Sequence, residues 1–127
     1  MTKPDGLQKA LLCTRAALDK NALDLVVLDV AGLTSIADYL VICAARSDRQ
    51  VQSIAQAIEE ALGQAGTRPI SVEGVRRGQW ALLDCGDVIV HVFYQPVREF
   101  YDLERLWEHA PRVQLPEPLR SQASAGR

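Results

Sequence analysis

The sequence predicts a single α/β (α+β) domain in which helices pack on a mixed β-sheet of about five strands. Two stretches repeat their apolar residues at helical spacing, and five shorter apolar stretches have the length and composition of strands. The connections between these stretches include both a tight turn and a long helical link, so antiparallel and parallel strand pairs are both expected. A length of 127 residues fits one such domain.

Composition excludes several broad classes of protein. Hydrophobic residues make up 48% and charged residues 24%, so disorder over the whole length is not expected. The longest apolar run, Tyr39 to Ala45, has seven residues, far fewer than the ~20 of a membrane span. The polar N-terminus lacks a signal-peptide pattern, and three cysteines without a Cys-x-x-Cys pair fit a reducing, cytoplasmic location. A net charge of −2 argues against broad non-specific binding to nucleic acid.

Two long helices begin at recognisable caps. The first is expected over residues 6–20, where Asp5 and Gln8 have the spacing of a capping box. The second is expected over residues 48–64, preceded by Ser47 with Gln50 three residues later. One face of this second helix is apolar; it carries Val51, Ile54, Ala55, Ile58, Leu62 and Ala65.

The expected strands cover residues 24–30, 38–45, 69–73, 79–85 and 87–95. The apolar residues of the first are consecutive and rich in valine rather than alternating with polar ones, so both of its faces should be covered. Gly86 should form a tight hairpin between the last two strands. The element order is then α-β-β-α-β-β-β-α. The helix at 48–64 would make a right-handed crossover if the strands on either side of it were parallel neighbours.

The last part of the chain is expected to change character twice. Pro96 can open a short helix over residues 97–109, in one or two pieces. From Pro111 onward the chain holds three prolines followed by small polar residues, and it has little to bury. We therefore expect a domain at residues 1–110 and a disordered C-terminal tail at residues 111–127.

No pattern of catalytic residues stands out. His91 lies within a strand on the same face as Ile89 and Phe93, which favours a structural or interface role. The serines lack the surroundings of a nucleophile elbow. The three cysteines are interpreted as small buried hydrophobic residues. No cofactor is expected.

The carboxylates Asp84 and Asp87 flank Gly86 and open an enzymatic alternative. Two carboxylates at a hairpin could hold Mg²⁺, as in a metal-dependent nucleotidyltransferase-like enzyme. The favoured interpretation is turn chemistry, in which aspartate side chains accept hydrogen bonds from loop N–H groups. The glycines at 74 and 78 bracket a loop that lacks the residue order of a phosphate-binding loop. We expect no metal site.

Aromatic and acidic residues are concentrated in the second half. Six of the seven aromatic residues lie between positions 80 and 107, and positions 73–108 hold seven acidic residues against four arginines. Such a composition is typical of a protein-binding surface. Phe93 and Phe100 are expected to fill the core. Trp80 begins a strand beside the glycine loop and should be partly exposed.

A series of motifs resembles the ribosomal silencing factor family, also called the Iojap family. The likeness covers roughly residues 7–110. The motifs that carry it, in order, are Leu28-Asp29-Val30, Ile36-Ala37-Asp38-Tyr39, Ser47-Asp48-Arg49-Gln50, Glu73-Gly74, Trp80, Asp84-Cys85-Gly86-Asp87, Val90-His91-Val92 and Leu103-Glu104-Arg105-Leu106-Trp107.

This resemblance implies a non-enzymatic protein with a nucleotidyltransferase-like core. Members bind the large ribosomal subunit through its fourteenth protein, on the face that meets the small subunit. They thereby block subunit joining and repress translation during nutrient limitation or stationary phase, and organelle relatives assist large-subunit assembly. The resemblance also implies a homodimer when the protein is free. No membrane and no sequence-specific nucleic acid is expected as a partner.

The partner-binding residues are expected among the aromatic, arginine and acidic side chains of the second half. Aromatic and arginine side chains dominate interface hot spots, and carboxylates complement a basic ribosomal protein. The expected residues are Glu73, Trp80, Asp84, Arg98, Tyr101, Glu104 and Trp107.

Overall fold

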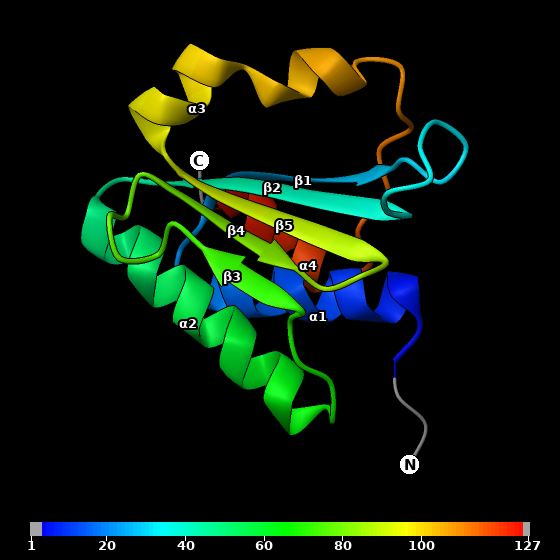
Figure 1. Cartoon of the computed structure of the whole chain (residues 1–127), viewed down its shortest axis with the longest axis horizontal. Helices are drawn as coiled ribbons and strands as arrows, with labels where there is room; N and C mark the ends of the chain where they lie inside the picture. Colours follow the sequence, from blue (N-terminus) through cyan, green and yellow to red (C-terminus); the bar gives the residue numbers. More distant parts are fainter. Residues whose placement is uncertain (1–3, 126–127) are drawn as a thin grey trace.

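The computed structural model describes residues 4–125 and contains one five-stranded mixed sheet with helices on both faces (Figure 1). The predicted α+β fold class is confirmed. The elements are α1 (Gly6–Asp19), β1 (Leu23–Asp29), β2 (Tyr39–Ala45), α2 (Asp48–Gln64), β3 (Ser71–Glu73), β4 (Trp80–Asp84), β5 (Val88–Tyr94), α3 (Gln95–Tyr101), the 3₁₀ helix η1 (Leu103–Trp107) and α4 (Leu119–Ala125). None of the helices within residues 4–125 combines the length and apolarity needed to cross a membrane.

The strands lie in the order β1-β2-β5-β4-β3. Within the described sheet only β2 and β5 are a parallel pair, and the other pairs are antiparallel. The strands on either side of α2 are therefore not neighbours, and the conditional prediction of a crossover between them does not apply. The hairpin at Gly86 turns β5 inward against β2, because β5 is apolar along nearly its whole length and is best buried in the sheet centre.

The first helix begins as its sequence predicts. The Asp5 carboxylate accepts a hydrogen bond from the Gln8 N–H at 2.8 Å, and the Gln8 side chain accepts one from the Asp5 N–H at 3.1 Å. This reciprocal pair confirms the predicted capping box. The helix ends at Asp19, and Asn21 then adopts a left-handed backbone conformation with φ 63°.

The second helix starts with half of the predicted capping box. Ser47 Oγ accepts a hydrogen bond from the Gln50 N–H at 3.0 Å. The Gln50 side-chain oxygen accepts from the N–H of Arg46 at 2.7 Å, one residue earlier than a box requires. Gln50 Nε2 donates to the carbonyls of Lys20 and Asn21. Gln50 therefore ties the start of α2 to the end of α1, which a purely local pattern could not show.

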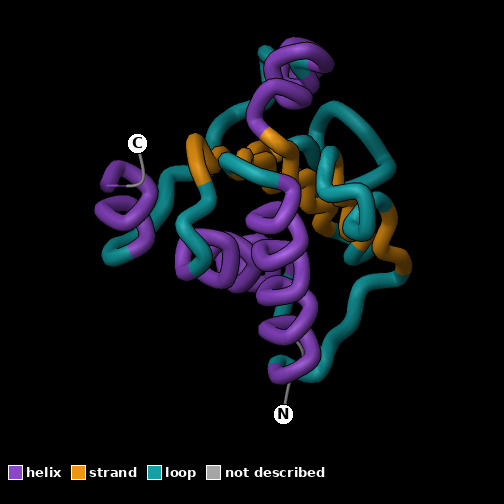
Figure 2. The backbone as a smooth tube through the Cα atoms, turned by 90° about the vertical axis from the view of Figure 1, so that its left-hand side faces the viewer, coloured by secondary structure: helices purple, strands orange, loops and turns teal. Residues whose placement is uncertain are grey.

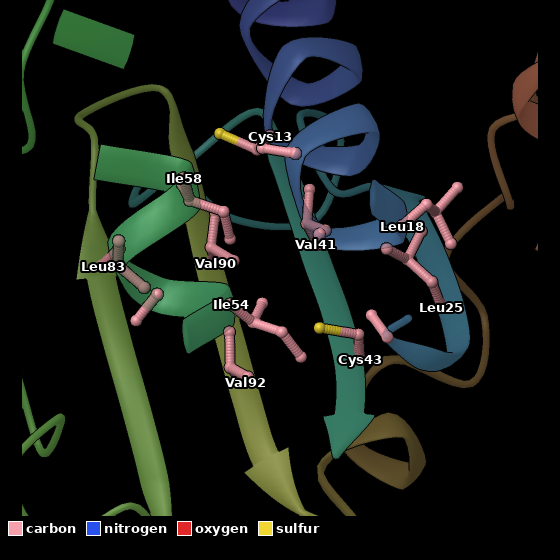
Figure 3. Packing of buried hydrophobic residues seen from close by; sticks show 14 of the residues in the cluster. Cys13, Leu18, Leu25, Val41, Cys43, Ile54, Ile58, Leu83, Val90 and Val92 are labelled. Atoms are coloured by element: carbon pink, nitrogen blue, oxygen red, sulfur yellow. The ribbon is translucent and has the colours of Figure 1, made fainter. Parts of the chain in front are cut away.

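One face of the sheet is sealed by α1 and α2. Figure 3 shows Val90 and Val92 of β5 beside Ile58 and Ile54 of α2, and Val41 of β2 beneath α1. These residues are fully or almost fully buried. All three cysteines are buried and unpaired, as the sequence predicts. This cluster is the main core of the molecule.

The opposite face is covered only in part, by α3 and η1 (Figure 2). Phe93 is fully buried there and packs with Ile42 and Leu40. The two helical pieces are separated by Asp102, whose φ of 47° turns the chain. The predicted division of residues 97–109 into one or two pieces is thus resolved as two.

The segment after Pro111 is ordered, which differs from the disordered tail that its composition predicts. The Asp29 N–H donates to the Pro111 carbonyl at 2.8 Å, and the Val113 N–H donates to the Val27 carbonyl at 2.8 Å. These bonds cover the free edge of β1. Leu119 of α4 is only 6% exposed and joins the main core. The last two residues of the expected tail lie outside the described part of the chain.

Candidate functional site

Four rings form an aromatic cluster on the partly covered face of the sheet: Trp80, His91, Phe93 and Tyr101. The Trp80 indole Nε1–H donates to His91 Nδ1 at 3.0 Å. The Trp80 ring centroid lies 4.8 Å from that of Phe93 and 5.1 Å from that of Tyr101. Sheet register causes this arrangement, because Trp80 of β4 pairs with Phe93 of β5. Tyr101 reaches the cluster from the end of α3.

His91 is held neutral at the base of the cluster. It is 7% exposed, and burial lowers its pKa from 6.5 to about 4. A neutral imidazole leaves Nδ1 free to accept the Trp80 proton. His91 therefore orients Trp80, in agreement with the structural role favoured from the sequence.

Beyond the cluster, the sheet face is open. Because α3 packs over β5 and β2, β4 is left half-covered on this side. Trp80, Leu82 and Asp84 are half-buried, while Ala81 and Leu83 on the other side of β4 are completely buried. The open strip leads from the aromatic cluster to the edge strand β3, where Glu73 is exposed.

A hollow of about 540 Å³ borders the cluster, between α3 and the loop that precedes β4. Tyr101 is 55% exposed and Phe100 is 80% exposed at its α3 wall. The prediction that Phe100 fills the core is therefore wrong. In a seven-residue helix that only partly covers a sheet, Phe100 points away from the sheet, whereas the adjacent Tyr101 keeps contact with Trp80.

Arg98 and Glu104 are paired beneath the bend between α3 and η1. Arg98 Nε lies 3.3 Å from Glu104 Oε1, and the Arg98 side chain is only 11% exposed. A side chain so buried cannot be the first surface that a partner meets. Arg98 instead fixes the angle of the bend and with it the position of Tyr101, three residues later.

The other expected partner-binding residues are spread over the same face. Trp107 of η1 is half-buried and packs on the cluster that includes Phe93. Asp84 lies at the opposite end of β4 from Trp80, beside the hairpin. The structure thus brings Trp80 together with Tyr101, and Arg98 with Glu104, while Glu73, Asp84 and Trp107 lie around them as separate points.

The hairpin carboxylates are occupied by internal bonds. Asp84 Oδ1 accepts from the Gly86 N–H at 2.9 Å, which is the turn chemistry favoured from the sequence. Asp87 Oδ1 lies 2.7 Å from Lys9 Nζ of α1. Within residues 4–125 no group of three potential metal ligands comes together.

The cysteines lie in the main core. Burial raises the pKa of Cys43 to about 12. A hydrogen bond with Cys85 raises the pKa of Cys13, and the same bond lowers the pKa of Cys85. All three pack as small apolar side chains, and none faces the aromatic cluster.

Phe100 and the loop residues Arg77 and Gln79 line the hollow and are not among the binding residues expected from the sequence. The adjacent glycines were a usable signal, since paired glycines around a short basic loop indicate a backbone forced into an unusual path. No local signal shows that α3 faces this loop.

Comparison with known proteins gives a consistent result. A family described as "RsfS: Ribosomal silencing factor during starvation" matches residues 3–127. The chain is 43% identical over 110 residues to "Ribosomal silencing factor RsfS" of Bacillus subtilis, covering 85% of this chain and 93% of that protein. It is 31% identical over 118 residues to "Protein Iojap, chloroplastic" of Arabidopsis thaliana, covering 93% of this chain and 49% of that longer protein. A crystal structure of a Chromobacterium violaceum protein superposes with a TM-score of 0.81 at 33% identity, over 90% of this chain and 92% of that one.

Proposed function

Because this chain belongs to the ribosomal silencing factor family, we propose that it binds the large ribosomal subunit on the face that meets the small subunit. Bound there, it blocks subunit joining by occupying space and so represses translation. This is the activity that its family resemblance implies for nutrient limitation or stationary phase. The proposed site of action is the cytoplasm, and assistance in large-subunit assembly is a second proposed role.

The observation that carries the proposal is the aromatic cluster left half-open on one face of the sheet. Trp80 is oriented from below by its hydrogen bond to His91 and from the side by Phe93. A ring fixed in this way loses little conformational entropy when a partner covers it. Fixed aromatic rings at the centre of a patch are the usual hot spots of protein interfaces.

The charges around the cluster suit a basic partner. Glu73 is exposed on the edge strand, and Asp84 and Glu104 are half-buried at two other points of the face. Carboxylates in such positions attract a basic protein and favour one orientation. We propose that this partner is the fourteenth protein of the large subunit, in keeping with the family resemblance.

The area required is available. A stable protein interface buries about 800 Å² on each partner. The accessible surface of the chain is 7409 Å², so the footprint takes about a tenth of it. The open strip of β4 and β3, with the exposed side chains of α3, forms one continuous side of the molecule on which such a footprint fits.

Exclusion of the small subunit by this footprint needs no catalytic step, and we propose that the chain is not an enzyme. The two carboxylates of the alternative enzymatic hypothesis are engaged internally, Asp84 with the hairpin backbone and Asp87 with Lys9. Pairing of two free copies into a homodimer stays a prediction.

Sedimentation of purified components tests the proposal. The protein is mixed with large and small subunits under conditions that allow joining, and the mixture is separated on a sucrose gradient. We expect the protein to travel with free large subunits and the joined-ribosome peak to shrink as protein is added. A parallel mixture with small subunits alone is the control and should leave the protein at the top. Protein that travels with joined ribosomes, or with neither subunit, would contradict the proposal.

A further inference from the structure

The hollow beside the aromatic cluster has two walls of different chemistry. One wall is α3, with the exposed rings of Phe100 and Tyr101. The other is the loop from Gly74 to Gln79, which contributes Arg77 and Gln79. Trp80, Tyr94, Pro96 and Val97 complete the lining. The hollow is therefore lined mostly by aromatic and apolar side chains, with one cation and one amide on the loop side.

The conformation of the loop wall is fixed by contacts within the chain. Gly74 and Gly78 have φ of 80° and 67°. A Cβ at position 74 would collide with the Trp80 carbonyl, and one at position 78 would come within 2.6 Å of Asp48. The backbone is thus pressed against β4 on one side and the start of α2 on the other. Gln52 of α2 donates to the Arg76 carbonyl at 2.9 Å and holds the tip of the loop. Both walls are present before any ligand arrives.

The charge inside the hollow is positive. Arg77 is the only charged side chain that lines it, and neither Arg77 nor Arg76 takes part in an ion pair within residues 4–125. Glu73 and Glu99 lie on adjoining segments but do not line the hollow. Local chemistry here differs from the acidic surroundings of the rest of the face.

We propose that this hollow binds a nucleotide, with its base against the exposed rings of α3 and its phosphate at Arg77. Aromatic side chains beside a cation are the arrangement that proteins use to bind nucleotides without reading their sequence, because every base offers a flat ring. Gln79 adds donor and acceptor groups at the rim. The source is a free mononucleotide or an unpaired nucleotide of RNA, which share this chemistry.

The nucleotide site overlaps the proposed ribosomal contact at Trp80 and Tyr101 but has two residues of its own, Phe100 and Arg77. The two proposals can therefore fail separately. Loss of nucleotide binding in a chain that still binds the large subunit would leave the proposed function intact. A bound free mononucleotide would compete with the ribosomal partner for the shared rings.

Backbone amide NMR of the full chain tests the site, with three probes added in turn at low salt: adenosine monophosphate, single-stranded hexa-adenylate and inorganic phosphate. We expect saturable shifts in residues 74–80 and 97–101 with one or both adenylate probes. Response to the monophosphate identifies a free nucleotide as a source, and response to hexa-adenylate alone identifies RNA. Equal shifts with inorganic phosphate would show an anion site only and overturn the proposal. Shifts scattered over surface lysines and arginines, or none in the hollow, would also overturn it.

Three variants sharpen the test. Phe100→Ala and Arg77→Ala each remove an exposed group, so their melting temperatures should match the parent, and each should weaken nucleotide binding about tenfold or more. Arg105→Ala removes an exposed arginine of η1 outside the hollow and should change the affinity less than about twofold. An equal effect of Arg105→Ala and Arg77→Ala would show general charge attraction and contradict the site.

Discussion

The two faces of the sheet carry different side chains and are covered by helices to different extents. Toward α1 and α2 the sheet presents small aliphatic residues, such as Val41 and Val90, that are completely covered. Toward α3 and η1 it presents the rings of Trp80, His91 and Phe93 beside larger aliphatic residues such as Leu40 and Ile42, and that face is covered only in part. The first face can be filled by two long helices, whereas the second has a seven-residue helix and a five-residue turn of 3₁₀ helix.

This difference suggests that the closed face mainly stabilises the fold and that the open face mainly binds partners. A closed aliphatic face contributes burial and little else, because no partner can reach it. A half-open aromatic face gives up part of its burial and keeps rings that a partner can cover. Substitutions on the two faces should therefore divide into those that unfold the chain and those that leave it folded but unable to bind.

The largest expected effect on stability is on the closed face. Ile54→Ala truncates a fully buried residue of α2 that packs between the helices and the sheet, and it should lower the free energy of unfolding by about 4 kcal/mol. Denaturant titration measures this. Where the variant still folds, its affinity for the large subunit should equal that of the parent. A cost below about 1 kcal/mol would show that this face is not the main source of stability.

The second largest expected effect is a loss of stability in acid that acts through His91 on the open face. The pKa of His91 is about 4 in the folded chain against 6.5 for an ordinary histidine. As pH falls below 6.5, His91 takes up a proton in the unfolded chain before it does so in the folded chain. The free energy of unfolding should therefore fall by about 3 kcal/mol between neutral pH and pH 4. The same protonation breaks the hydrogen bond from Trp80. His91→Phe should flatten this part of the stability profile, whereas His109→Gln, at an exposed histidine, should not. Parallel profiles for the parent and His91→Phe would contradict the assignment.

A smaller effect is expected where the end of the chain docks on the closed face. Leu119→Ala removes a side chain that is 6% exposed and packs with α1 and β1. We expect a loss of about 2 kcal/mol, since a terminal helix can partly collapse into the space. Thermal unfolding measures the loss, with Arg120→Ala, at an exposed position of the same helix, as the control. An unchanged melting temperature for Leu119→Ala would mean that α4 adds nothing to the fold.

The helices were predictable because their signals are local. Asp5 with Gln8, and Ser47 with Gln50, fix the two starts within four residues of chain, and the extent of α2 agrees with its prediction at both ends. The order of the strands was not predictable in the same way. The pairing of β2 with β5 joins residues far apart in sequence, and several sheet orders bury the same apolar stretches.

The site was predictable in composition but not in arrangement. Trp80 and Tyr101 could be named as anchors from residue type, yet their contact depends on the direction in which α3 leaves β5. That direction also exposes Phe100 and buries Arg98. The tail was misjudged because Leu119 and Val113 have partners only in the folded domain.

If the half-open aromatic face is the ribosome-binding surface, as we propose, single substitutions on it should lower the affinity for isolated large subunits. Trp80→Ala and Tyr101→Ala should each weaken binding by about 30-fold or more, equivalent to about 2 kcal/mol. Tyr101→Ala should keep the melting temperature of the parent because Tyr101 is 55% exposed. Leu7→Ala, at a partly exposed position of α1, is the matched control and should bind as the parent does. Normal binding by a folded Tyr101→Ala chain, together with loss of binding in Leu7→Ala, would contradict the claim and move the contact to the helical side.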